Sequence, residues 1–347
     1  MTVAGMDAGQ RAMRPPLTFA LLRLLVDGEF HSGEVLARRL GVSRTSVSNA
    51  LRGMEDFGLS LYSVRGRGYC LSNPPQWLDA VRIKRHLGKQ AQHFKIEILD
   101  STPSSNTLLL QRAAQDAPSG TVLAVEWQSS GRGRLGRAWH SGLGNALTFS
   151  LLWRFELGLS ALSGLSLAAG VALIRALRAF GIDSARLKWP NDVLGSEGKL
   201  AGILLEAQGD MLGPSAVVIG IGLNMSMPQN LLPQIEQSAT SLQDMVAAAP
   251  NSNVPERNAL LSRVLLELQG VLHEFAQHGF AALRTEWERY HVWQNQIVRL
   301  TLSDGSSAVG IARGVTNNGE LVLETAHGRK IFNNGEISLR PVKNVTD

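Results

Sequence analysis

The most distinctive segment of this 347-residue chain is Glu126-Trp127-Gln128-Ser129-Ser130-Gly131-Arg132-Gly133-Arg134-Leu135-Gly136-Arg137-Ala138-Trp139-His140. It follows an apolar run, residues 121–125, that predicts a buried β-strand. The glycines let the backbone approach a ligand closely and expose its N–H groups, and the arginines add planar donors suited to phosphate or carboxylate. The segment therefore predicts a loop that folds over an anion. Taken alone, it is equally typical of an Arg-Gly segment that is disordered or binds nucleic acid.

Two further stretches distinguish between these interpretations. One is Lys188-Trp189-Pro190-Asn191-Asp192, followed by Gly198-Lys199-Leu200-Ala201-Gly202-Ile203-Leu204, and the other is Gly220-Ile221-Gly222-Leu223-Asn224. In this order and spacing, the loop and these motifs resemble the biotin–protein ligase family over residues 96–340. A winged-helix pattern precedes them, so the chain resembles the bifunctional members of that family, which also repress the biotin operon.

Composition is ordinary for a soluble globular protein, with 44% hydrophobic and 18% charged residues. No apolar run is long enough for a membrane span, and residues 1–16 lack the apolar core of a secretory signal and are expected to be disordered. The single cysteine, Cys70, excludes an intrachain disulfide and a multi-cysteine metal site, which indicates a cytoplasmic location.

Charge is concentrated near the N-terminus. Residues 1–75 contain nine Arg and six Asp or Glu, a net of +3 out of +5 for the whole chain. This asymmetry favours a nucleic-acid partner for the N-terminal part.

The N-terminal pattern predicts a helix-turn-helix. A helical stripe runs from Leu17 to Val26, Ser32 is the expected N-cap of a helix over 33–40, and Ser43 caps a third helix. Val47, Leu51 and Met54 form the buried stripe of that third helix. Its opposite face, the expected DNA-reading face, carries Arg44, Thr45, Ser48, Asn49 and Arg52.

Two short strands, 59–64 and 69–72, predict a hairpin wing with Arg65 and Arg67 at its tip. Small three-helix units without DNA-binding activity also show the helical pattern, but the wing and the charge bias favour DNA binding. The polar helix face suits the major groove, and the wing arginines suit phosphate or minor-groove contacts.

The linker Asn73-Pro74-Pro75-Gln76 separates this unit from the rest, because two prolines cannot continue a strand ladder. We therefore expect a multidomain α+β protein: a winged helix-turn-helix over 17–73, an α/β biotin-ligase catalytic domain over 77–290, and a C-terminal β-barrel over 293–342. The barrel rests on closely spaced short strands separated by Asn-Gly and Asp-Gly turns, and the resemblance implies that it is SH3-like.

The resemblance implies a two-step reaction. The biotin carboxylate attacks the α-phosphate of MgATP to give biotinyl-5′-adenylate and pyrophosphate, and a lysine of the biotin carboxyl carrier protein of acetyl-CoA carboxylase then attacks the mixed anhydride. Both steps gather negative charge at one phosphorus and one carboxylate, so cations and N–H donors in a closed pocket are the main catalytic requirement.

The resemblance also implies the roles of the site residues. Lys199, which bridges the biotin carboxylate and the α-phosphate, and Arg134 are the expected catalytic residues; a solvated strand-end lysine is the alternative for Lys199. The expected biotin-binding residues are Ser104, Ser105, Asn106, Gln128, Arg132, Gly133, Arg134, Lys199 and Gly202. The expected ATP-binding residues are Arg137, Lys188, Asn191, Asp192 and Asn224.

Three positions leave alternatives. Ser101-Thr102 matches the family's Ser-Thr-Asn group as an alternative to residues 104–106, which are preferred because Asn106 directly precedes a Leu-rich helix. Trp139 either closes over the site or is a core tryptophan. Leu135 stands where the family commonly has a fourth arginine, which bears on loop closure and its coupling to dimerisation.

The predicted function is a biotin–[acetyl-CoA-carboxylase] ligase that is also a repressor of biotin-synthesis genes, with biotinyl-5′-AMP as corepressor. Biotin, ATP and Mg²⁺ are the expected ligands, with no dedicated metal site beyond Asp192. The expected partners are the carrier protein, operator DNA and a second copy in a ligand-promoted homodimer, with no membrane. The alternatives are a lipoate–protein ligase and a biotin-sensing transcription factor without ligase activity, whose expected sign would be loss of Lys199 or the loop arginines.

Overall fold

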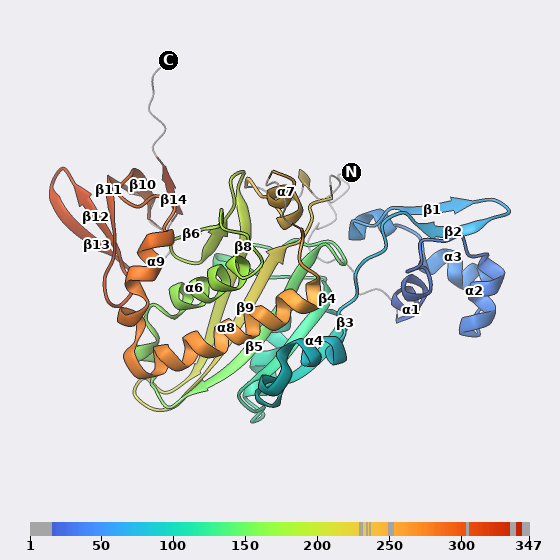
Figure 1. Ribbon diagram of the computed structural model, residues 1–347, viewed down its shortest axis with the longest axis horizontal. Coiled ribbons are helices and arrows are strands. Elements are labelled where there is room, and N and C mark those ends of the chain that lie inside the picture. Colours follow the sequence, from blue (N-terminus) through green and yellow to red (C-terminus); the bar gives the residue numbers. More distant parts are fainter. Residues whose placement is uncertain are drawn as a thin grey trace, which may run out of the picture.

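The computed structural model describes residues 16–228, 232–233, 235, 237–248, 253–302, 305–333 and 338–341. The expectation of disorder over residues 1–16 falls almost entirely outside this part of the chain. Figure 1 shows a small helical unit at one end of the molecule, a large sheet covered by helices in the middle, and a second, smaller sheet at the other end. The predicted order of a helix-turn-helix, an α/β unit and a β unit is confirmed.

The N-terminal unit is a three-helix arrangement with a hairpin. It contains α1 (Pro16–Leu24), α2 (Gly33–Leu40), α3 (Arg44–Ala50), η1 (Met54–Phe57) and the antiparallel pair β1 (Leu61–Val64) and β2 (Gly68–Leu71). Ser32 and Ser43 accept hydrogen bonds from backbone N–H groups of the first turns of α2 and α3, as expected for N-caps. Helix α3 ends before Met54, which lies in η1, but Leu51 and Met54 are still buried.

The central unit is built on a seven-stranded sheet with the order β3-β4-β5-β9-β8-β7-β6. Strands β3 and β4 are parallel, and the other neighbours are antiparallel. The strands are β3 (Lys95–Thr102), β4 (Thr121–Gln128), β5 (Ala146–Phe155), β6 (Arg186–Lys188), β7 (Asp192–Leu194), β8 (Lys199–Gly209) and β9 (Ser215–Asn224). Every residue of β4 and β9 is buried, because helices cover both faces of the sheet at these strands.

Helices form a layer on each face of this sheet. On one face lie α4 (Ala80–Leu87), α6 (Leu165–Arg178) and α8 (Arg257–His278), which cross the sheet in Figure 1 and belong to the main hydrophobic core. Helix α5 (Ser105–Ala113) covers the other face in a smaller core with Leu123, Leu152 and Val218. The remaining elements are η2 (Gly88–His93), η3 (Arg134–Gly136), η4 (Leu159–Leu162), α7 (Leu242–Ala247), η6 (Phe280–Ala282) and α9 (Arg284–Tyr290).

The C-terminal unit is a five-stranded antiparallel sheet with the order β13-β12-β11-β10-β14. Its strands are β10 (Ile297–Thr301), β11 (Ser307–Val315), β12 (Leu321–Thr325), β13 (Gly328–Phe332) and β14 (Ser338–Pro341). In the described residues β13 and β14 remain the two edges, so the predicted β unit is confirmed but its closure into an SH3-like barrel is not. Its buried residues, including Val298, Leu300 and Leu339, join the main hydrophobic core of the central unit.

One buried ion pair joins several of these elements. Arg257 Nη1 of α8 lies 2.8 Å from Glu126 Oε2 of β4, and the two side chains are 2% and 0% exposed. The same guanidinium donates to the carbonyls of Gln76 in the linker and Ala146 in β5, and Glu126 Oε1 accepts from the backbone N–H of Leu78. The pair therefore connects the linker, β4, β5 and α8.

Replacing Glu126 with glutamine should destabilise the protein by about 3–5 kcal/mol, because it leaves the buried Arg257 guanidinium without a counter-charge. Urea unfolding followed by circular dichroism measures the change. The control is Glu97→Gln, whose partner Arg112 and own side chain are 32% and 41% exposed, so that its loss should cost about 1 kcal/mol or less. Equal unfolding midpoints for the two variants would contradict the proposed importance of the buried pair.

Candidate active site

A pocket lies at the end of the central sheet from which the glycine-rich loop departs. It has a volume of about 510 Å³, which is within the range of small-molecule sites. Its walls come from the N-terminus of α5, the loop 132–140, the ends of β6, β7, β8 and β9, and residues Leu339 and Arg340 of β14. Six lysine and arginine side chains line it against one aspartate, so the pocket favours an anion.

One part of the pocket is a chain of neutral polar groups. The Ser105 backbone N–H donates to Gln128 Oε1 at 2.7 Å, the Ser105 and Ser150 hydroxyls are 2.7 Å apart, and Ser150 Oγ donates to Asn106 Oδ1 at 2.5 Å. Ser104 caps α5 by accepting from the Thr107 N–H. The predicted residues 104–106 therefore line the pocket, as does Gln128, whereas the alternative pair Ser101-Thr102 lies in β3 and is not among the described lining residues.

A cationic part faces these groups. Lys199 Nζ is 2.7 Å from Asp192 Oδ1, and Lys188 Nζ is 3.3 Å from Asp192 Oδ2. Burial lowers the pKa of the Lys188 ammonium from its ordinary value, and the Asp192 carboxylate opposes this shift. Lys199 is only 17% exposed and is therefore not a solvated strand-end lysine.

The glycine-rich loop is a short hairpin that brings arginines to the pocket. Gly133 N–H donates to Arg137 O, Trp139 N–H donates to Gly131 O, and Arg132 pairs with Ala138 across the hairpin. Leu135 at the tip is 53% exposed and has a φ of 60°, a conformation that is strained for a leucine. The backbone of Leu135 is therefore left-handed and does not continue a regular helical turn.

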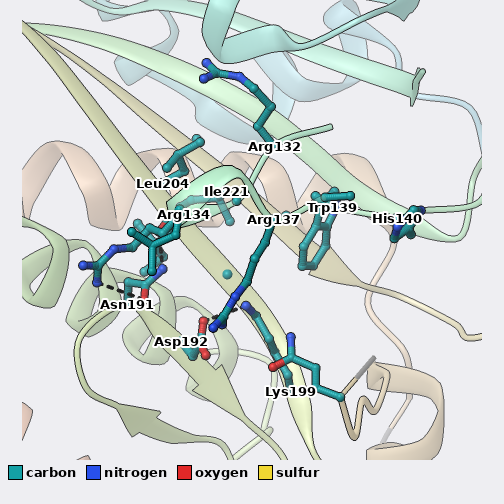
Figure 2. Close-up of a pocket in the computed structure, with 18 of the residues that line it drawn as sticks. Arg132, Arg134, Arg137, Trp139, His140, Asn191, Asp192, Lys199, Leu204 and Ile221 are labelled. Atoms are coloured by element: carbon teal, nitrogen blue, oxygen red, sulfur yellow. Dashed lines mark hydrogen bonds and ion pairs between the residues drawn. The ribbon is translucent and has the colours of Figure 1, made fainter. Parts of the chain in front are cut away.

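The three arginines of this loop point in different directions. Figure 2 shows Arg137 running toward Asp192 and Lys199, and Arg134 lying beside Asn191, whose Oδ1 is 3.5 Å from Arg134 Nη1. Burial lowers the pKa of Arg134, with Asp192 opposing and Arg137 adding to the shift. Arg132 instead points away from Asp192 and Lys199 and lies 2.7 Å from Glu206.

Trp139 forms a wall of the pocket, which distinguishes between the two interpretations of this residue. Its ring lies over glycines of two neighbouring strands: a Cβ added at Gly222 of β9 would be 2.3 Å from the indole, and one at Gly202 of β8 would be 3.6 Å from it. Lys199 Nζ is 5.9 Å from the centre of the ring. Gly222 thus provides the space in which Trp139 closes this side of the pocket, whereas a Cβ at Gly202 would first meet the Lys199 side chain, at 3.1 Å.

Two predicted nucleotide contacts also make structural hydrogen bonds. Asn224 Nδ2 donates to the carbonyls of Lys199 and Thr240, which attaches residues 238–240 to the start of β8. Asn191 Nδ2 donates to the Ile203 carbonyl at 2.8 Å. Both side chains still line the pocket.

Three residues at the site were not predicted from the sequence: Arg340, which lines the pocket, and Ser150 and Glu206, which hydrogen-bond to the lining residue Asn106. Ser150 lies in a buried strand and Arg340 in a distant domain, so that no local motif marks either of them. Among the described residues, no group of three His, Cys, Asp or Glu side chains is placed to hold a metal. Both oxygens of Asp192 are already bonded to lysines, so the pocket offers no preformed Mg²⁺ cage.

The expected DNA-binding residues form an exposed surface on the N-terminal unit. Arg44, Thr45, Ser48 and Asn49 are exposed along α3, and Arg65 and Arg67 are exposed at the hairpin tip. Arg52 is also exposed, but it lies in the turn after α3 and not on the helix as predicted, because the helix ends at Ala50. Arg44 also pairs with Glu34 at 2.9 Å. The opposite side of this unit contacts the central unit, where the Phe57 ring lies 4.7 Å from that of Trp127 and Leu143 N–H donates to Phe57 O.

In the described part of the chain, no helix is both long and apolar enough to cross a bilayer. Family models match three regions: an HTH domain at residues 18–70, the biotin/lipoate A/B protein ligase family at 98–224, and the biotin protein ligase C-terminal domain at 295–340.

Relatives cover nearly the whole chain. A bifunctional ligase/repressor BirA of Salmonella typhimurium is 38% identical over 94% of this chain and 97% of its own length. A biotin–[acetyl-CoA-carboxylase] ligase of Mycobacterium tuberculosis is 34% identical over 70% of this chain and 88% of its own length. Among solved structures, a biotin protein ligase from Aquifex aeolicus in complex with biotin and ATP is 28% identical, with a TM-score of 0.60 over 72% of this chain and 99% of that one.

Replacing Gly222 with alanine should displace the Trp139 ring, because the new Cβ would be 2.3 Å from it. The loop should then open, so trypsin should cleave faster at Arg134 and Arg137, and tryptophan emission should shift to the red. The control is Gly270→Ala, since nothing lies within 4 Å of a Cβ at that exposed position of α8. Equal cleavage of the two variants would mean that Gly222 is not what seats the indole.

Proposed function

Because the chain belongs to the biotin–protein ligase family and matches its bifunctional ligase/repressor members over nearly its whole length, we propose that it activates biotin with ATP and transfers it to a protein lysine. The observation that carries this proposal is one pocket with a neutral polar part and a cationic part. The acceptor is the biotin carboxyl carrier protein, and the N-terminal unit binds operator DNA of biotin genes. The location is cytoplasmic.

The neutral part of the pocket suits the ureido ring of biotin. This ring presents two N–H donors and one carbonyl acceptor, and the chain Gln128–Ser105–Ser150–Asn106 offers amide and hydroxyl groups of both kinds. The dithiolane ring of lipoate has neither N–H donors nor a carbonyl and would make no hydrogen bonds with these groups, and a site built to hydrogen-bond its substrate rejects a ligand that lacks them. Biotin is therefore favoured over lipoate.

The cationic part suits the reacting carboxylate and the ATP phosphates. Lys199 belongs to the cationic part of the pocket and would neutralise charge on both the biotin carboxylate and the α-phosphate as the new P–O bond forms. Lys188, Arg134, Arg137 and Arg340 would bind the remaining phosphate charge. A Mg²⁺ ion bound to ATP would arrive with its own phosphate and water ligands. Asp192 is the carboxylate of the pocket that would contact it.

We propose that DNA binding and biotin ligation are divided among three domains with the boundaries 17–73, 77–290 and 293–342. The matched regions 18–70 and 295–340 support the first and last of them. Leu339 and Arg340 line the pocket, so the C-terminal unit completes the ligase site. We further propose that this unit is an SH3-like barrel.

Replacing Lys199 with alanine should slow biotin-dependent ATP–pyrophosphate exchange about 10²-fold, because one electrostatic contact in a dry site contributes roughly 3 kcal/mol. Exchange assays with biotin, with lipoate and with neither acid test the proposed substrate at the same time. The control is Lys89→Ala, an exposed lysine of η2. Exchange by the wild type with lipoate but not biotin, or with neither, would overturn the proposed function; full activity of Lys199→Ala would overturn only the role of that lysine.

Biotinyl-5′-AMP should shift the protein from monomer toward dimer and tighten operator binding in parallel. One winged helix provides few base contacts, whereas two copies give a usable footprint. The adenylate can act in this way only if it binds the dimer better than the monomer, and a loop already ordered by the ligand costs less entropy to pair.

Sedimentation with and without the adenylate, with operator binding at fixed salt, measures both effects. Arg52→Ala should weaken operator binding and leave biotin transfer unchanged, and Lys330→Ala on the exposed β13 should change neither. If oligomeric state and operator affinity are both indifferent to the adenylate, the ligand-promoted dimer is not a property of this protein.

A further inference from the structure

Glu206 makes contacts that the ligase motifs do not explain. It lies in β8, seven residues beyond Lys199, and its side chain is 25% exposed. Both of its carboxylate oxygens accept from Arg132 Nη2 of the glycine-rich loop, at 2.9 and 2.7 Å. Its Oε2 also accepts from Asn106 Nδ2 of α5 at 3.0 Å. A single carboxylate thus joins β8, the loop and the residue proposed to meet the ureido ring.

The contact with Asn106 determines which way the amide of that residue faces. A carboxylate accepts hydrogen bonds and cannot donate them, so the NH₂ group of Asn106 must face Glu206. The second amide hydrogen is bound by the Leu204 carbonyl at 3.2 Å, and Oδ1 accepts from Ser150. Oδ1 is consequently held against Gly220 of β9, which lines the pocket together with Asn106, and Ser150 is its donor among the described residues. Without the charge, a flipped amide would present donors where an acceptor is needed.

The contact with Arg132 ties the loop to the same point. A partly exposed ion pair contributes little to stability on its own. We therefore expect the pair Arg132–Glu206 to act mainly by positioning the glycine-rich loop. Asn106 is also confined by β9, because a Cβ at Gly220 of that strand would lie 2.2 Å from Asn106 Oδ1. Loop and amide therefore share one fixed support.

We infer that Glu206 is a positioning residue that orients the Asn106 amide toward the substrate ring and, through Arg132, anchors the glycine-rich loop over it. This inference rests on the proposed function, since it takes the ring to be the ureido ring of biotin. Glu206 acts through Asn106 and Arg132 and does not itself contact the reacting atoms.

The first test separates positioning from a merely structural role. Glu206→Gln keeps the shape of the side chain but can donate to Asn106 Oδ1 and so permits the flipped amide. We expect its KM for biotin to rise about tenfold, the effect of losing one charge-assisted hydrogen bond, with kcat and the KM for ATP changed less than about twofold. Glu206→Asp, which can only accept, should recover part of the loss. The control is Glu97→Gln, which breaks an ion pair with Arg112 outside the pocket.

The second test needs no substrate. Glu206→Ala and Arg132→Ala should each speed tryptic cleavage at Arg134 and Arg137, and the double variant should add little to either, because both remove the same anchor. Glu97→Ala should not change cleavage.

Each outcome of these tests bears on a different statement. Two results would overturn the orienting role. One is a biotin KM in Glu206→Gln equal to that of Glu97→Gln, and the other is a fall in kcat together with a similar rise in the KM for biotin and for ATP and a lowered unfolding midpoint. Additive effects on cleavage would overturn the anchoring role. Absence of biotin-dependent exchange in the wild type would instead overturn the proposed function and, with it, the identity of the ring, while the cleavage test would still decide the anchor.

Discussion

The buried pair Glu126–Arg257 is the interaction on which the arrangement of the pocket depends. It joins the backbone at Gln76 and Leu78 to the end of β4 and the start of α8, and both charged side chains are buried from solvent. The next two residues of β4 face different partners: Trp127 packs against Phe57 of the winged helix, and Gln128 enters the pocket. A shift of β4 at Glu126 would consequently move both the DNA-binding unit and the polar part of the site.

The pocket itself works by separating two kinds of polar group. Neutral amides and hydroxyls of Ser105, Ser150 and Asn106 are bonded to one another in one part, and the lysines share Asp192 in the other. Lys199 on β8 and Lys188 on β6 both contact Asp192, the aspartate among the described lining residues. The pocket therefore combines neutral hydrogen-bonding groups and positive charges in one cavity.

Close approach of side chains to the backbone explains the glycines of β8 and β9. Gly220 leaves room for Asn106, Gly222 leaves room for Trp139, and Gly202 leaves room for the side chain of Lys199. The spacing of two residues puts Gly220 and Gly222 on the same face of β9, as the alternation of a strand requires. These glycines therefore contribute to the site by making room for side chains that line the pocket.

Local patterns were sufficient to predict the helix-turn-helix, its caps at Ser32 and Ser43, the strands around the loop, and the order of the three units. These features depend on periodicity and on capping within a few residues, which a sequence displays directly. The membership of Lys199, Asn191, Asp192 and the loop arginines in one pocket could also be predicted, because they lie in motifs whose order resembles a known family. Only the tertiary structure decided which of two serine-threonine groups lines the pocket, that Arg132 pairs with Glu206, and that Ser150 and Arg340 join the site. Such contacts join residues that are 44 to more than a hundred positions apart, and no short-range pattern encodes them, because they follow from how strands are ordered in the sheet and how the C-terminal unit packs against it.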